Sequence, residues 1–340
     1  EILPISSNFV DLFANSENEF RFFIMNSIVF FLKIGGFSGV PIEKKFFSQC
    51  FFLIIHQYFL KISCLPNLEL LKICLDWWKF FFYKFEEKKN SILIEKLSNC
   101  FFIDLIIVLT GRMAKPEEIL IRENGSGEVI RETIIDTDSN VLYEKIRKVL
   151  IVLVKLEPSF SQQFFLKKLS LQFQKTYWNR KSLSSICWSI GSISNAFSPE
   201  EEKKFLVNVI KDLLLLCEVK KGKDNKAVIA CNIMFIVGAY PQFLQNHKKF
   251  LKTVLQKLFE FMKESHPGIQ DMASDTFLKL GKSCSTKISF YCENGETPLM
   301  EEIFENAKDL VKILEFRQKR QLFETLAILS FSFENSSKKN

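Results

Sequence analysis

The sequence predicts an all-α protein, an α-α superhelix (solenoid) of HEAT-type helical repeats with one inserted β-hairpin loop. Apolar residues recur with the period of amphipathic helices along most of the chain. Helix starts near residues 160, 199 and 244 have the spacing of HEAT-type helical pairs. A β-prone stretch around an Asn-Gly turn interrupts the helices once. Because one such pair cannot bury its apolar face alone, stacked pairs share a continuous core.

The apolar period defines the individual helices, and local signals mark several of their ends. Residues 198–201, SPEE, combine a capping Ser, a Pro at the first helical position and a Glu at the third. Asp224 or Asn225 can cap the next helix, and Pro241 and Pro267-Gly268 separate later ones. The predicted helices are 8–14, 18–34, 43–63, 67–86, 91–113, 140–156, 160–173, 180–196, 199–219, 225–239, 243–263, 268–284, 299–314 and 317–333.

The exception is residues 119–131, ILIRENGSGEVIR, which have β-prone residues on both sides of an Asn-Gly-Ser-Gly turn. This pattern predicts a hairpin. Inserts in solenoids lie on one face and often contact partners, although a purely structural hairpin fits the sequence equally well. We therefore divide the chain into divergent HEAT repeats over 1–113, an inserted hairpin loop over 114–140, and HEAT repeats over 141–340.

Bulk properties narrow the class of protein. The chain has 340 residues, of which 47% are hydrophobic and 25% charged, a composition typical of globular proteins. Its net charge of +7 suits an acidic partner. The apolar stretch at 46–60 is short for a membrane span, and no signal peptide is expected. The chain starts at Glu1 rather than Met, so we expect a piece of a longer protein.

An enzyme is not expected from the reactive residues. The 9 Cys include no C-x-x-C pair, which favours reduced, buried thiols in a nuclear or cytosolic protein. His56, His247 and His266 have no Cys or carboxylate at a metal-ligand spacing, so neither a metal site nor a cofactor is expected. No Ser or Cys has a base at a recognisable offset.

Two helices carry more apolar surface than a single core contact needs. On a helical wheel, one stripe of residues 250–262 is formed by Leu251, Leu255, Leu258, Phe259 and Met262, and a second beside it by Phe250, Val254 and Phe261. Together the stripes span roughly 180°, whereas a core contact needs about 100°. The helix at 199–219 has a similar excess, with Ile210, Leu214 and Cys217 on one face. If these helices are neighbours, they form a groove for an apolar helix.

The rim of this groove is basic. Residues 203–257 contain eleven Lys, no Arg and three acids, which would steer acidic flanks of a peptide. Alternatively, the extra stripes pack on other repeats and the lysines form a solvated face. Cys217 is either a small buried hydrophobe or an accessible thiol activated by Lys211 or Lys223.

The residues themselves resemble the exportins, the export-signal receptors of the importin-beta (karyopherin) family. The similarity is specific from about 112 to 285 and covers RMAKPEEILIRENGSGEVIRETIIDTDSNVLYEKIR (112–147), ICWSIGSISNAF (186–197), the run 200–262 and GIQDMASDTFLKL (268–280). Only scattered features match before residue 112. Members of the family are longer, so the chain is either a fragment or a reduced version, and the site for the GTPase Ran is incomplete.

The resemblance implies a superhelix without enzymatic activity that binds leucine-rich export signals in a groove between the helices at 199–219 and 243–263. The matching groove residues are Ile210, Leu214, Cys217, Ala230, Met234, Phe243, Phe250, Val254, Phe261 and Met272. The rim residues are Lys211, Lys223, Lys226 and Lys257. Cys217 matches the cysteine that leptomycin-type inhibitors attack. The hairpin resembles a loop that contacts Ran and controls cargo release; its matching residues are Glu123, Asn124, Gly125, Gly127, Glu128 and Val129.

The implied partners are cargo proteins with leucine-rich signals, Ran-GTP and nuclear pore proteins, with GTP entering only through Ran. The resemblance also implies shuttling between nucleus and cytoplasm, without membrane insertion or direct nucleic-acid binding. Two alternatives stay open: a HEAT scaffold without export-signal binding, and an RNA-binding exportin-like solenoid. A decayed groove would show charged substitutions, and none occurs at the ten matching positions. An RNA-binding solenoid would need a denser Arg/Lys face.

Overall fold

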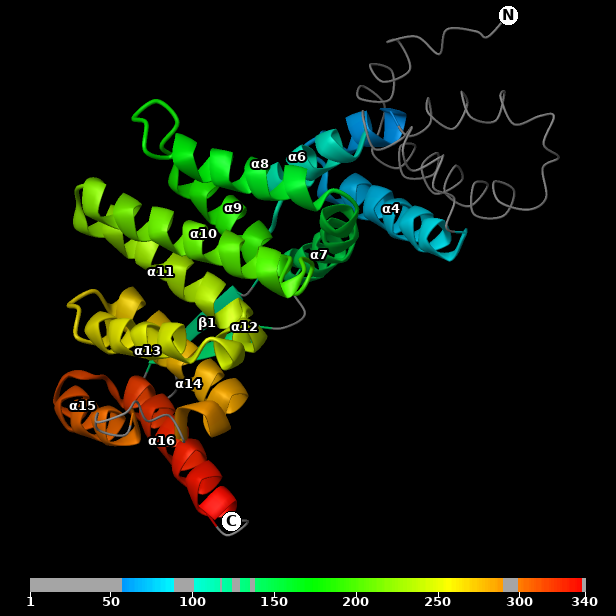
Figure 1. The fold of residues 1–340 in the computed structure, drawn as a ribbon. Helices are drawn as coiled ribbons and strands as arrows, with labels where there is room; N and C mark the ends of the chain where they lie inside the picture. Colours follow the sequence, from blue (N-terminus) through cyan, green and yellow to red (C-terminus); the bar gives the residue numbers. More distant parts are fainter. Residues whose placement is uncertain are drawn as a thin grey trace, which may run out of the picture. The chain divides into compact units, whose positions relative to one another are not determined.

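The computed structural model describes residues 57–88, 101–116, 118–123, 129–134, 138–289 and 299–337 (Figure 1). The predicted helices at 8–14 and 18–34, and most of the one at 43–63, lie outside these residues. The chain divides into two compact units, Glu1–Ser161 and Gln162–Asn340.

In the first unit, helix α4 (Leu68–Lys88) packs against α7 (Asp138–Leu156). Trp77 and Trp78 of α4 are fully buried, because the aromatic residues of this helix recur on the face that turns inward. Ion pairs fix the same two helices at their surface, with Lys145 Nζ 2.6 Å from Asp76 Oδ1. Helix α6 (Ile103–Gly111) also contacts α7 and ends close to the predicted limit of 113.

The predicted β-hairpin is confirmed. Strands β1 (Glu118–Glu123) and β2 (Val129–Ile134) pair antiparallel, with Glu118 opposite Ile134 and Glu123 opposite Val129. The Asn-Gly-Ser-Gly turn that predicted them falls in residues 124–128, which lie outside the described part of the chain.

The second unit is built from helical pairs in two layers. Helices α9, α11, α14 and α16 pack on one another in succession and form one layer, while α10, α12, α13 and α15 lie in the other (Figure 1). This is the architecture of HEAT-type repeats, as predicted. The helices, with α8 crossing the boundary between the units, are α8 (Pro158–Leu171), α9 (Arg180–Ser192), α10 (Pro199–Val219), α11 (Lys223–Ala239), α12 (Pro241–Asn246), α13 (Lys248–Met262), α14 (Pro267–Ser289), α15 (Leu299–Ile313) and α16 (Phe316–Ser337).

The continuous layer is tightly joined. A Cβ atom on Gly281 of α14 would clash with the Thr325 side chain of α16, so any other residue there would force the two helices or the Thr325 side chain to shift. The Tyr240 hydroxyl, at the end of α11, donates a hydrogen bond of 2.6 Å to the carbonyl of Ile190 in α9. Both contacts are buried, and they fix the spacing of successive repeats.

The capping prediction for α10 is confirmed: Ser198 is the N-cap, Pro199 is the first helical residue and Glu201 is the third. The Glu201 carboxylate accepts hydrogen bonds from both the backbone N–H and the hydroxyl of Ser198. The capping prediction for α11 is wrong. Its N-cap is Gly222 at φ +98°, so Asp224 and Asn225 lie inside the first turn. A glycine reaches this backbone conformation without steric cost, and it therefore starts the helix two residues early.

The prediction of one continuous helix over 243–263 is also wrong. The structure contains two helices over this range, α12 and α13, which are separated at His247. The His247 ring stacks on Phe243, and its Nδ1 lies 2.9 Å from the Phe243 carbonyl oxygen. No single described helix is long and apolar enough to cross a membrane, and α7 and α8 meet that test only jointly, across a bend of 117°.

Candidate functional site

Helix α10 turns different faces to the core and to its neighbour along the layer. Phe205, Val209, Leu213 and Leu216 are buried against the rest of the repeat. Ile210, Leu214 and Cys217 form the adjacent face, where Ile210 is nearly buried and the other two are half-exposed. Because this face is apolar but not fully covered, it can form one wall of the candidate groove.

Helix α13 provides the opposite wall. The stripe predicted to lie in the core is buried: Leu251, Leu255, Leu258, Phe259 and Met262 are at most 3% exposed. In the second stripe, Phe250 and Phe261 are half-exposed and Val254 is 9% exposed.

The orientation of α13 follows from its contacts with α15. Gln256 Nε2 donates to Glu302 Oε1 at 2.8 Å, and Lys263 Nζ donates to Asn306 Oδ1 at 3.2 Å. On the helical wheel these residues lie opposite the second stripe, which therefore faces α10. The close contacts of α10 on this side are with α11 and α12.

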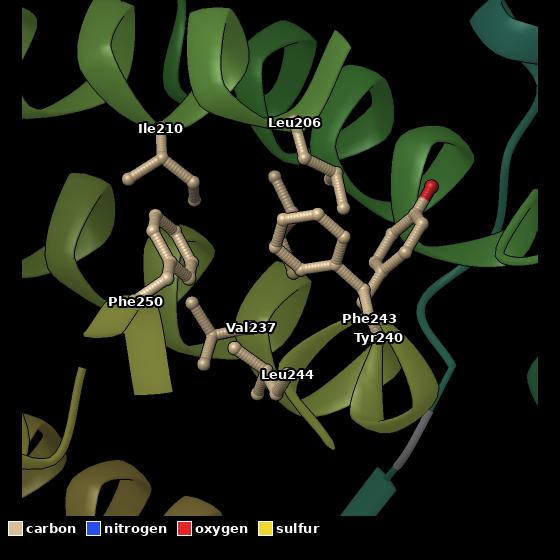
Figure 2. A pocket seen from close by; sticks show the side chains of 8 residues that line it. Leu206, Ile210, Val237, Tyr240, Phe243, Leu244 and Phe250 are labelled. Atoms are coloured by element: carbon tan, nitrogen blue, oxygen red, sulfur yellow. The ribbon is translucent and has the colours of Figure 1, made fainter. Parts of the chain in front are cut away.

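At one end the two walls close over a small apolar cavity of about 10 Å³, room for about one water molecule (Figure 2). The Phe243 ring meets the Phe250 ring edge-on, with centroids 5.5 Å apart. The groove at this end is therefore filled by its own side chains. The lining residues are Leu206, Ile210, Ile236, Val237, Tyr240, Phe243, Leu244 and Phe250.

Helix α11 forms the floor, running antiparallel to α10. Its Lys226 carbonyl lies 4.0 Å from Cys217 Sγ, and its Val237 lines the cavity near Leu206. Ala230 and Met234 fall between these two ends on the same face of the helix and are buried. Met272, on α14, is half-exposed.

The structure therefore places the ten predicted groove residues on α10, α11, α12, α13 and α14, of which Ile210, Phe243 and Phe250 meet in the cavity. Five cavity residues were not predicted: Leu206, Ile236, Val237, Tyr240 and Leu244. Leu206 lies one turn before Ile210 on the same face, so the helical period itself was a signal for it. Tyr240 and Leu244 lie where α11 ends and α12 begins; Pro241 predicted a break there, but not that the two side chains flanking it line a cavity.

The predicted rim residues Lys211, Lys223, Lys226 and Lys257 are all exposed. Lys257 forms an ion pair of 2.6 Å with Glu260 one turn along α13. Within the described part of the chain, the other three make no ion pair. The rim is therefore positive beside α10 and α11 and locally neutralised on α13.

Cys217 is half-buried, which agrees with a partly accessible thiol. The expectation that a neighbouring lysine activates it is not supported. Burial raises the pKa of the thiol; Lys226 opposes that rise, while Glu218 and Glu264 add to it. The lysine that matters is thus Lys226, rather than Lys211 or Lys223, and its effect is smaller than that of desolvation.

The structure describes two of the six predicted hairpin residues. Of the hairpin residues, Glu123 and Val129 are paired across the two strands, whereas Asn124, Gly125, Gly127 and Glu128 lie outside the described residues. Within the described ranges, no group of three or more His, Cys, Asp and Glu residues is placed to hold a metal ion.

Comparisons with known proteins give the class of the chain. Two family profiles match, CRM1 / Exportin repeat 2 at residues 97–161 and CRM1 / Exportin repeat 3 at residues 174–224. With the two-layered helical pairs, these matches define a HEAT-type protein built from exportin repeats. A chain of a solved structure concerning Kap95p and RanGDP has a TM-score of 0.49 at 10% identity, over 91% of this chain and 40% of its own, too weak a likeness to define a fold.

Curated relatives give the particular family. Exportin-1 of Dictyostelium discoideum is 41% identical over 88% of this chain and 29% of its own length. Exportin-1 of Schizosaccharomyces pombe is 37% identical over 95% and 33%, and Protein EXPORTIN 1A of Arabidopsis thaliana is 36% identical over 96% and 33%. The chain is therefore a relative of exportin-1 and corresponds to its central region. It spans about a third of the length of these relatives.

Proposed function

We propose that this chain is the cargo-binding region of a nuclear export receptor, and that the groove between α10 and α13 binds leucine-rich nuclear export signals. The observation that carries the proposal is the pair of apolar walls that face each other over a buried floor. A ligand helix with apolar residues at positions i, i+3 or i+4 and i+7 presents the complementary stripe. The relationship to exportin-1 supports this use of the groove.

The cavity of about 10 Å³ has a consequence for affinity. Apolar ligand side chains cannot enter the Leu206–Phe250 end unless the Phe250 ring or the α13 wall moves away from Ile210. If only a fraction of molecules has the open groove, the apparent affinity falls by that fraction. Under this proposal Ran-GTP favours the open form of the groove, and the hairpin of β1 and β2 takes part in that control. The whole receptor shuttles through the nuclear pore by contacts with pore proteins. The chain needs no cofactor of its own, since GTP belongs to Ran.

The direct test is fluorescence anisotropy of a labelled leucine-rich export peptide titrated with the chain. Val254→Asp places a charge on the α13 wall and should abolish saturable binding, because an unpaired carboxylate in an apolar contact is strongly unfavourable. Phe261→Ala should weaken binding by about tenfold if the ring buries its remaining exposed area on the peptide.

Leu215→Asp is the control. Leu215 lies on the face of α10 turned away from Ile210 and Cys217 and is 47% exposed, so a carboxylate there should leave binding unaltered. Equal binding by the wild type and Val254→Asp would contradict the proposal. Binding by the wild type only in the presence of Ran-GTP and the flanking repeats would identify groove opening as the step that Ran controls.

A further inference from the structure

The turn between α10 and α11 is fastened to the segment that precedes α9. Lys220, at the end of α10, donates from Nζ to the Phe173 carbonyl at 3.3 Å. The same ammonium lies 4.6 Å from the centroid of the Trp178 ring. The turn then passes through Gly222 at φ +98° into the first turn of α11, which carries the rim residues Lys223 and Lys226.

Arg180, the first residue of α9, holds that first turn of α11. Its Nε donates to Asn225 Oδ1 at 2.9 Å, and one terminal nitrogen lies 3.8 Å from Asp224 Oδ2. Asn225 in turn donates from Nδ2 to the Lys221 carbonyl at 2.8 Å. A side chain of the preceding helical pair therefore holds Asp224 and Asn225, the two residues between Lys223 and Lys226.

The contact also determines local charge. Asp224 is the acidic residue in the first turn of α11, and Arg180 compensates its carboxylate on the side of α9. Lys223 and Lys226, in contrast, pair with no acid in the described ranges. Exposed charges influence one another over a screening length of about 8–10 Å. Because Asp224 lies between Lys223 and Lys226 in the same helical turn, an uncompensated Asp224 would cancel part of the positive potential at the groove rim.

We propose that Arg180 is a positioning residue for the groove rim, which orients the first turn of α11 through Asn225 and compensates Asp224, so that Lys223 and Lys226 present net positive charge to an acidic flank of the bound peptide. This inference rests on the proposed function of the groove. It assigns to Arg180 an effect on the choice between peptides rather than on the apolar contact. The ligand class that it favours is an amphipathic peptide with Asp or Glu next to its apolar stripe.

The test compares two labelled peptides with the same apolar residues, one with acidic flanks and one with neutral Ser and Gln flanks. Arg180→Gln should weaken binding of the acidic peptide by about two- to five-fold, the range of an exposed ion pair, and leave the neutral peptide unchanged. Arg180→Lys keeps the charge and should retain most of the preference. The preference of the wild type should fall with rising salt.

A double-mutant cycle separates action through Asp224 from a direct effect of the Arg180 charge. In an Asp224→Asn background, Arg180→Gln should change the acidic-peptide affinity less than it does in the wild type. An equal change in both backgrounds, or an equal weakening of both peptides, would overturn the proposal. Wild-type binding without flank preference would overturn it as well, while leaving the groove intact. Wild-type failure to bind either peptide would instead contradict the proposed function, and the role of Arg180 with it.

Discussion

The two flanks of α13 show how one type of repeat packing gives two different surfaces. Toward α15, the helix is joined by polar side chains, Gln256 to Glu302 and Lys263 to Asn306. Toward α10, it presents Phe250 and Phe261, which are both half-exposed. The polar side chains of one flank already have hydrogen-bond partners on the neighbouring helix. The apolar side chains of the other flank are stabilised only when another apolar surface excludes water from them.

The largest expected effect is a difference in stability loss between a core residue of α13 and a residue of its groove-facing stripe. Leu255→Ala should lower the free energy of unfolding by about 2–5 kcal/mol, because the side chain is fully buried and leaves a cavity. Phe261→Ala should cost only about 1 kcal/mol, because its ring is already partly in water. Urea denaturation followed by circular dichroism measures both. Equal losses would mean that Phe261 belongs to the core and not to a groove.

The next effect tests the packing within the layer formed by α9, α11, α14 and α16. Gly281→Ala should destabilise the second unit by roughly 1–3 kcal/mol, because the new methyl group meets Thr325 and the overpacking outweighs the gain in helix propensity. Gly111→Ala, at the end of α6, is a suitable control, since its Cβ would meet nothing within 4 Å. Unchanged stability of Gly281→Ala would show that α14 and α16 separate easily to accommodate the methyl group.

A smaller effect is expected on the polar flank. Gln256→Ala removes the hydrogen bond to Glu302 and should cost about 0.5–1.5 kcal/mol of stability. Peptide affinity in the groove should not change, because Gln256 lies on the opposite side of the helix. Thr253→Ala provides the control, because Thr253 is an exposed position of α13 whose hydroxyl donates to the Lys249 carbonyl of the same helix. A loss of peptide binding in Gln256→Ala would mean that the two flanks are coupled.

The smallest effect concerns the thiol at the far end of the groove. Because burial raises the pKa of Cys217, less thiolate is present at a given pH than in a free cysteine. Alkylation of Cys217, measured by peptide mass spectrometry, should be slower than that of a free thiol and should still accelerate above the usual thiol pKa. Lys226→Gln removes the influence that lowers the pKa and should slow the reaction further. Faster alkylation than that of a free thiol would contradict this account.

The helical parts of the fold could be predicted because they depend on local sequence. The limits of α10 are those that the apolar period and the SPEE cap predict. The hairpin followed from its turn chemistry. The break at His247 could not be predicted, because the residues around it are all compatible with a helix and the break is accompanied by a contact between the His247 and Phe243 rings.

The candidate site was predictable to the same extent. The helical wheel identified which apolar residues of α10 and α13 lie beyond the core-facing stripe. It could not say which neighbouring helix these residues face. That assignment came from the hydrogen bonds between α13 and α15. The cavity residues Tyr240 and Leu244 depend on the chain path between helices, and the pairing of Arg180 with Asn225 joins residues 45 positions apart.

The interruption at His247 separates two parts of the groove that a continuous helix would have joined. Phe243 and Leu244, which line the cavity, belong to α12, whereas Phe250, Val254 and Phe261 of the wall belong to α13. In one continuous helix, any tilt of the wall would also displace Phe243 and Leu244. Because the two helices are separate, α13 can move toward or away from α10 without displacing these two cavity residues.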